Sequence, residues 1–335
     1  NDHVNMGQST NDTYPTALHV SVLMALQPLL SALDELSRAF EDLSTKNMHV
    51  LKSGRTHLQD AVPVTVGQEF GAYASAITNA SAELRRRQEN LYSVALGGTA
   101  TGTGANAHPE YKRIAIAELA NMTGFPLKPA NNNFEALQSH RAAQTISSGL
   151  KELALELIRI ANDLRLLASG PTTGLNEINL PPMQPGSSIM PGKVNPVMAE
   201  CLNMVAFQVV GNDAAVAMAV QAGQLELNVM TPVIAYNMLF SIQILTNYIP
   251  AFTEKCVRGI TVDEKRCEQY LEKNPSLATL LVPKIGYLEA AKIAKQAQAE
   301  NRTVKEVTIE KGLLIPEEIE KIFSRKNLLN EQTDK

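Results

Sequence analysis

The sequence predicts an all-α protein: a bundle of long helices with a small helical C-terminal domain. No stretch alternates apolar and polar residues over more than a few positions, which argues against a substantial sheet. The chain has no tryptophan and only 5% aromatic residues. Alanine and leucine therefore fill most of the core, and these residues suit closely packed helices.

The long helices are predicted from apolar residues at helical spacing. The first follows capping residues at positions 8–12, carries Pro15 in its first turn and is bent by Pro28. Further helices are expected over residues 64–94, 109–123, 134–169, 197–222 and 232–248. The helix over 64–94 would be about 45 Å long. Such helices cannot bury all their apolar surface within one small domain, so we expect several copies of the chain to associate.

The character of the sequence changes near residue 255. Short, charged helices are expected beyond it, over residues 262–273, 288–300, 303–311 and 316–324, followed by a frayed tail over 327–335. We therefore predict a long-helix domain over residues 1–254, which carries the polar motifs, and a small helical domain over 255–335. Because the chain starts at Asn1, without Met, and enters motif-like sequence at once, we expect it to be a partial chain.

Charge and apolar content argue against two classes of partner. The formal net charge is −4 and no basic run exceeds the triplet at residues 85–87, so nucleic acid is not expected to bind. The most apolar window, residues 204–222, contains Asn212 and Asp213 and is expected to be a buried helix, not a membrane span. No signal peptide is recognised, and three cysteines without metal-ligand spacing favour a reduced, cytoplasmic protein.

A loop rich in proline and glycine interrupts the long helices at residues 186–196. It carries two hydroxyls, one ammonium group and one amide, on Ser187, Ser188, Lys193 and Asn195. Lysine and asparagine donors suit a carboxylate, and a serine beside them loses its proton more readily than a free serine. Composition alone is equally compatible with an ordinary surface loop.

Three further polar groups each have a simpler alternative. Ser9, Thr10 and Asn11 stand at a helix N-terminus, which favours an anion, although ordinary capping would also explain Ser9. Thr56 and His57 follow Arg55 in a predicted loop, where a lone histidine is more often structural. Glu200 lies near a helix start and either orients a histidine or is a simple first-turn acid.

A glycine-rich segment lies at residues 97–104. It has the glycine content of a phosphate-binding loop, but no Lys-Ser/Thr ending follows it and no strand is predicted before it. A nucleotide site is therefore not expected there, and the segment is predicted to be a loop between helices.

Taken together, three of these blocks resemble the signature regions of the fumarase/aspartase superfamily, in the same order. They are Ser-Thr-Asn at 9–11, Gly-Arg-Thr-His at 54–57 and the whole loop at 186–196. Adjoining blocks at residues 60–63, 67–70 and 226–229 match as well, so the resemblance runs over essentially the whole chain. The superfamily's N-terminal domain has no counterpart in the sequence and is expected to be missing.

The resemblance implies a homotetramer in which each active site is assembled from three subunits. The implied reaction is reversible anti elimination across the C2–C3 bond of a small dicarboxylate, giving fumarate, with neither a metal nor an organic cofactor. Four residues would be catalytic: Ser187 as base, Lys193 at the carboxylate that gains charge, and His57 oriented by Glu200. The implied substrate-binding residues are Ser9, Thr10, Asn11, Thr56, Ser188 and Asn195.

Within the superfamily, two groups of lyases compete. Thr10, the block at residues 193–197 and the blocks at 175–178 and 222–225 resemble aspartate ammonia-lyases. Residues 133–137, 95–98 and 285–287 resemble class II fumarases. The first set lies nearer the implied substrate, so aspartate is the expected substrate and malate the alternative. A non-catalytic structural protein of the same fold remains a third reading, against which the intact Ser187, Lys193 and His57 argue.

Overall fold

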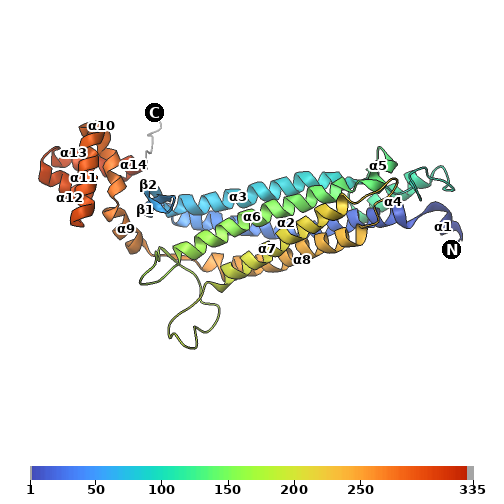
Figure 1. Ribbon diagram of the computed structural model, residues 1–335, viewed down its shortest axis with the longest axis horizontal. Coiled ribbons are helices and arrows are strands. Elements are labelled where there is room, and N and C mark those ends of the chain that lie inside the picture. The colour runs from blue at the N-terminus through green and yellow to red at the C-terminus, as the bar shows by residue number, and fades with distance from the viewer. Residues whose placement is uncertain (1, 330–335) are drawn as a thin grey trace. The chain divides into compact units, whose positions relative to one another are not determined.

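The computed structural model describes residues 2–329 and is predominantly helical, as predicted (Figure 1). The chain forms two compact units. The first comprises Asn1–Ala39, Ala74–Arg165 and Pro182–Arg258, and the second comprises Phe40–Tyr73, Leu166–Pro181 and Gly259–Lys335. Each unit is therefore built from segments far apart in the sequence. The predicted division between residues 1–254 and 255–335 stays a prediction.

Long helices running side by side form the first unit (Figure 1). Three of its helices, α2, α3 and α6, extend into the second unit. The helices are α1 (Asp2–Gly7), α2 (Thr10–Lys46), α3 (Val66–Gln88), α4 (Tyr111–Thr123), α5 (Asn133–Gln138), α6 (Arg141–Leu167), α7 (Val197–Val220) and α8 (Thr231–Lys255). The predicted start and apolar stripe of α2 are confirmed, since Val22, Leu26 and Leu33 are fully buried. α1 is a short helix that the polar N-terminal sequence does not predict.

Three predicted helices differ from the structure at their ends. The helix expected over 232–248 is α8, which continues to Lys255. α3 stops at Gln88 and is about 35 Å long. A 3-10 turn, η1 (Glu89–Tyr92), follows it, and then strand β3 (Ser93–Val94) pairs with β4 (Lys128–Pro129). The expected single helix over 134–169 is broken between α5 and α6. His140 has φ of 47° there, and this left-handed conformation cannot continue a right-handed helix.

The second unit contains a β-hairpin that the sequence patterns do not predict. Strand β1 (Leu51–Thr56) pairs antiparallel with β2 (Gln59–Thr65), with an irregularity between Ser53 and Arg55. Neither strand alternates regularly in hydrophobicity, and each contains a residue that disfavours strands, Gly54 or Pro63. A second short pair joins β5 (Ile178–Asn179) to β6 (Thr261–Val262).

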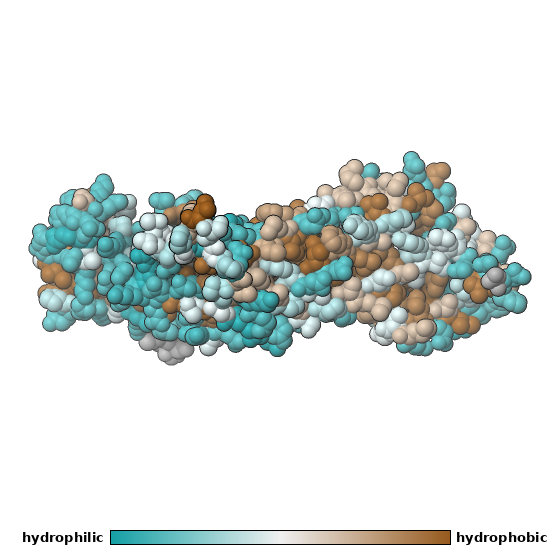
Figure 2. All heavy atoms as spheres, turned by 90° about the horizontal axis from the view of Figure 1, so that it is seen from below, coloured by the Kyte–Doolittle hydropathy of each residue, from teal (hydrophilic) through white to brown (hydrophobic). Residues whose placement is uncertain are grey.

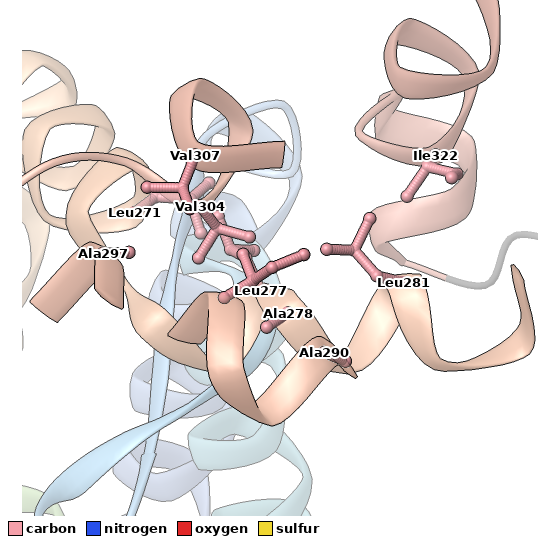
Figure 3. Close-up of a cluster of buried hydrophobic side chains, with 10 residues drawn as sticks. Leu271, Leu277, Ala278, Leu281, Ala290, Ala297, Val304, Val307 and Ile322 are labelled. Carbon is pink, nitrogen blue, oxygen red and sulfur yellow. The ribbon is translucent and has the colours of Figure 1, made fainter. Parts of the chain in front are cut away.

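Short helices complete the second unit. They are α9 (Glu264–Lys273), η3 (Pro275–Leu281), α10 (Val282–Ile285), α11 (Tyr287–Glu300), α12 (Val304–Lys311), α13 (Pro316–Ile322) and α14 (Arg325–Leu328), after the turn η2 (Val257–Gly259). Figure 3 shows Leu277, Val304 and Val307 gathered in their common apolar cluster. The predicted frayed tail is wrong at Asn327 and Leu328, which belong to α14, and its residues 330–335 lie outside the described residues.

Buried polar pairs join α7 to its neighbours in the first unit. The Asp213 carboxylate accepts a hydrogen bond from Ser147 at 2.7 Å and pairs with Lys151 at 2.5 Å, both on α6. Asn212 donates to the hydroxyl of Ser241 on α8 at 2.9 Å. Because these groups satisfy each other inside the bundle, they fix which face of α7 turns inward.

Two helices, α2 and α7, are long and apolar enough to cross a membrane by length and composition alone. In α2, 56% of the apolar window is buried inside the bundle, against 39% in α7. Packing within the chain therefore accounts for much of the apolar surface of α2. It accounts for less of α7, whose apolar side chains extend onto the surface.

The buried histidines of the first unit predict a dependence of stability on pH. Burial, with the neighbouring His140, lowers the pKa of His19 to about 4. Below pH ~6.5 the unfolded chain takes up a proton at this position while the folded chain does not, so the unfolded state gains stability. The free energy of unfolding should fall by roughly 3 kcal/mol on this account between pH ~6.5 and ~4.

Urea unfolding at pH 7, 5.5 and 4.5 measures this loss. His19→Gln should flatten the pH dependence, whereas the exposed His3→Gln should leave it unchanged. An equally steep fall in His19→Gln would assign the pH dependence to other groups.

Candidate active site

The loop at residues 186–196 is closed by its own backbone hydrogen bonds. The N–H of Ser187 donates to the carbonyl of Lys193 at 2.9 Å, and the N–H of Lys193 donates to the carbonyl of Met190 at 3.1 Å. Gly192 has φ of 81°, which favours glycine at this turn. The loop therefore holds Ser187 half-buried while its tip stays exposed.

The hydroxyl oxygen of Ser187 faces two backbone donors. The N–H groups of Met190 and Ile189 point to this oxygen at 3.2 and 3.4 Å. Donors aimed at an oxygen stabilise its anionic form more than its neutral form. This arrangement suits a serine that acts as a base.

The remaining polar groups of the loop are turned to solvent. Ser188 and Lys193 are exposed, and among residues 2–329 no carboxylate is paired with the Lys193 ammonium group. Asn195 is half-buried at the start of α7. Glu200 lies in the first turn of α7, as predicted, with an oxygen 4.0 Å from Nη2 of Arg165. The loop thus offers one unpaired cation and several hydrogen-bonding groups to a ligand.

Two of the three residues in the Ser9–Asn11 turn make structural hydrogen bonds. The Ser9 hydroxyl accepts the N–H of Asn11 at 3.2 Å, which is the capping role. The Asn11 amide donates to the carbonyl of Ala100 at 2.8 Å, in the glycine-rich segment. Thr10 is exposed at the first position of α2. Of the three residues, Thr10 is the one whose side chain faces solvent freely.

Asp12 is an organising residue that the sequence patterns did not single out. Its carboxylate is fully buried and accepts three backbone N–H groups, from Ser9 at 3.0 Å and from Gly97 and Thr99 at 2.9 Å. It therefore ties the glycine-rich segment to the start of α2. Its position three residues after the capping Ser9 is the available signal, because an acid there commonly closes a capping box.

Thr56 and His57 lie at the tip of the β1–β2 hairpin, in the second unit. Thr56 pairs with Gln59, and the two residues between them, His57 and Leu58, have φ of 54° and 59°. Two-residue turns with both φ values positive normally contain Asn-Gly. A histidine and a leucine in these positions are strained, and all three side chains from Thr56 to Leu58 are exposed.

Within the first unit, two of the polar clusters are far apart. Asn11 bonds the glycine-rich segment, which contacts α5 through Asn133. The carbonyl of Leu137 on α5 accepts the N–H of Asn228, whose side-chain amide donates to the last two carbonyls of α7. The loop at 186–196 instead precedes the N-terminal end of α7, about 36 Å away along this helix (Figure 1). One chain therefore does not bring Ser9–Asn11 next to Ser187–Asn195.

A family model described as "Lyase" matches residues 1–211, and a second, "Fumarase C C-terminus", matches residues 277–330. The chain belongs to this lyase family. It is an enzyme of the lyase type, and the resemblance of its motifs to the fumarase/aspartase superfamily is confirmed.

Curated relatives include aspartate ammonia-lyases and a fumarase. The lyase is 46% identical over 324 residues to aspartate ammonia-lyase of Bacillus subtilis, covering 97% of this chain and 68% of the relative. It is 46% identical over 333 residues to class II fumarate hydratase of Thermosynechococcus vestitus, covering 99% and 71%. Sequence identity alone therefore does not separate the two activities.

Solved structures share the helical fold. A fumarate lyase:delta crystallin from Brucella melitensis, bound to cobalt, has a TM-score of 0.93 and 48% identity, over 96% of this chain and 70% of that one. A class II fumarase from Schistosoma mansoni has a TM-score of 0.95 and 38% identity, over 99% and 73%. In the part of the lyase that the structure describes, no group of three His, Cys, Asp or Glu side chains could hold a metal ion.

The three backbone bonds to Asp12 predict a strong effect of one substitution. Asp12→Asn removes the charge and replaces one acceptor oxygen by an NH₂ group that faces backbone donors. The free energy of unfolding should fall by about 2 kcal/mol or more. Thermal unfolding measures this loss, and Asp42→Asn, an exposed site on the same helix, is the matched control. Equal melting temperatures of the two variants would contradict the anchoring role of Asp12.

Proposed function

We propose that the lyase catalyses the reversible elimination of ammonia from L-aspartate to give fumarate. The observation that carries the proposal is the Ser187 oxygen, which faces two backbone N–H donors in a loop that also presents Lys193. The aspartate ammonia-lyases among the relatives, at 46% to 49% identity, support the choice of substrate. So does the block at residues 193–197, which resembles theirs.

The difficult step is removal of a C3 proton that is not acidic. Ser187, as an alkoxide, takes this proton, and the electrons of the C3–H bond move into the adjacent carboxylate, which becomes an enediolate-like dianion. The ammonium group of Lys193 and the amide of Asn195 stabilise the added charge. The C2–N bond then breaks, its electrons leave with the nitrogen, and the C2–C3 double bond of fumarate forms.

The other polar clusters complete the proposed site. Ser9, Thr10 and Ser188 hold carboxylate oxygens. Asn11, Thr56 and His57 contact the departing nitrogen or its surroundings, and Glu200 orients His57. His57 is neutral in the aspartate complex, because a second positive charge beside the substrate ammonium would weaken binding.

We further propose a homotetramer whose active sites are shared between subunits. Two observations support it. The Ser9–Asn11 turn and the loop at 186–196 lie at opposite ends of the first unit, so a site that uses both needs residues from another copy. In addition, α7 and α8 expose large apolar side chains, and Figure 2 shows apolar surface on one face of the molecule. Met204, Phe207, Met218 and Tyr236 are exposed by 62%, 57%, 65% and 67%.

The substrate assignment predicts a dependence on ammonium. Purified lyase should consume fumarate only when ammonium is present, with aspartate as the product, because ammonia is the group that adds to the double bond. Loss of fumarate absorbance, with chromatographic identification of the product, measures this. Malate formation at a comparable rate without ammonium would assign the lyase to the fumarases, with Ser187, Lys193 and Asn195 in unchanged roles. Absence of both reactions would favour a structural protein.

The role of Ser187 predicts a selective loss of turnover. Ser187→Ala removes the base but leaves the carboxylate contacts, so kcat should fall at least about a hundredfold while KM changes little. Ser324→Ala, a half-buried serine in the second unit, is the control. Near-normal kcat in Ser187→Ala would mean that another group removes the C3 proton.

The exposed apolar helices predict a stable assembly. Light scattering at micromolar concentration should give about four times the chain mass, since such a surface is unfavourable in water. Phe207→Lys places a charge on the exposed face of α7 and should shift the protein toward smaller species. A wild-type monomer under these conditions would refute the shared-site proposal.

A further inference from the structure

The second unit contains a network of four charged side chains: Lys52 and Glu177, which are buried, and Arg55 and Glu69, which are partly exposed. The side chains of Lys52 and Glu177 are 1% and 0% exposed and pair at 2.7 Å. Arg55 forms a two-pronged pair with Glu177, at 2.8 and 3.0 Å. Lys52 also contacts both oxygens of Glu69, at 2.8 and 2.9 Å. The network contains two positive and two negative groups and balances its own charge.

Such a network contributes little net stability to a fold. Removing the charges of Lys52 and Glu177 from water costs free energy that the attraction among the four groups offsets only with good geometry. Apolar residues of the same size are often as stable. Stability alone therefore does not explain why charged residues occupy these four positions. Its position in the chain offers one, because Arg55 is the second residue before His57.

The network fixes strand β1 against three other segments of the second unit. The backbone carbonyl of Glu177, next to β5, accepts the N–H of Asp263 at 2.9 Å. The Arg55 guanidinium also lies 5.7 Å from the ring centre of Tyr270 on α9, and the Tyr270 hydroxyl donates to the carbonyl of Gly174 at 3.1 Å. Arg55 is thus held from two sides, immediately before the turn.

The side chains of the His57–Leu58 turn do little to stabilise its conformation. His57 and Leu58 carry positive φ values, which strain the backbone of residues other than glycine. Both side chains are exposed, Leu58 by 70%, so neither is fixed by burial within the chain. The strands on either side must therefore impose the strained conformation.

We propose that Glu177, with Lys52 and Arg55, is a positioning group that holds the His57–Leu58 turn in its left-handed conformation and so aims His57. This inference rests on the proposed function, which places His57 beside the departing nitrogen. The network does not touch the substrate. It acts through β1, and its loss would let the turn relax to conformations that suit histidine and leucine better.

The leading variant is Arg55→Lys, which keeps the positive charge but loses the two-pronged pair with Glu177. Hydrogen exchange followed by mass spectrometry should show amide exchange over residues 56–60 accelerated at least about tenfold. In the same protein, kcat for aspartate elimination should fall about tenfold with little change in KM. Arg302→Lys, a surface arginine paired with Glu300 and Glu310 in the same unit, should change neither quantity.

A second substitution that restores activity distinguishes a role in positioning the turn from a role in stability alone. Leu58→Gly, added to Arg55→Lys, should restore part of the lost kcat, because glycine adopts positive φ without strain. Glu177→Gln should repeat the pattern of Arg55→Lys if it folds. A melting temperature lowered in Arg55→Lys, with unchanged kcat and turn exchange, would mean that the network is only structural and would overturn the inference.

The two proposals fail in different ways. Absence of both elimination and hydration in the wild-type lyase would refute the proposed function. The exchange measurement on Arg55→Lys would still test the positioning of the turn. Normal wild-type activity with no effect of Arg55→Lys on either readout would refute the positioning role alone.

Discussion

The length of the helices is the constraint on which the rest of the molecule depends. A helix of 24 residues, such as α7, separates its ends by about 36 Å, and polar groups at opposite ends cannot meet within one chain. The same length presents more apolar surface than one chain covers, as the exposed Phe207 and Met218 illustrate. The separation of the clusters and the exposed apolar surface of α7 therefore follow from one geometric property, and the proposed homotetramer rests on both.

Buried carboxylates organise the polar segments at the helix ends. Asp12 collects three backbone N–H groups and joins the glycine-rich segment to α2, while Glu177 collects two cations and joins β1 to the chain around β5. In both cases a charge removed from water is tolerated because its partners are fixed in advance. Residues expected to bind the substrate are close in sequence to these contacts: Ser9–Asn11 directly precede Asp12, and His57 is two residues after Arg55, which pairs with Glu177.

The sequence predicted the long helices because packing repeats at helical spacing, and it predicted the polar motifs because their order is distinctive. It did not predict the hairpin, since Gly54 and Pro63 obscure strands that are held by Lys52 and Asn274 rather than by alternation. The role of Asp12 was not predicted, because the sequence does not distinguish a buried acid that binds backbone N–H groups from an ordinary capping residue. The breaks at Gln88 and His140 were not predicted because neither a proline nor a glycine marks them in the sequence.

The apolar cluster of the second unit has a consequence for how the chain folds. All its buried members come from residues 271–322, so the contacts among these members join positions close in sequence. Short loops close at low entropic cost, and structures rich in local contacts form quickly. The hairpin, by contrast, accepts a hydrogen bond from the Asn274 amide at the carbonyl of Ala61, 213 positions earlier in the chain. This bond can form only after two distant segments have met. The C-terminal helices are therefore expected to form first and to serve as the surface on which the hairpin is later assembled.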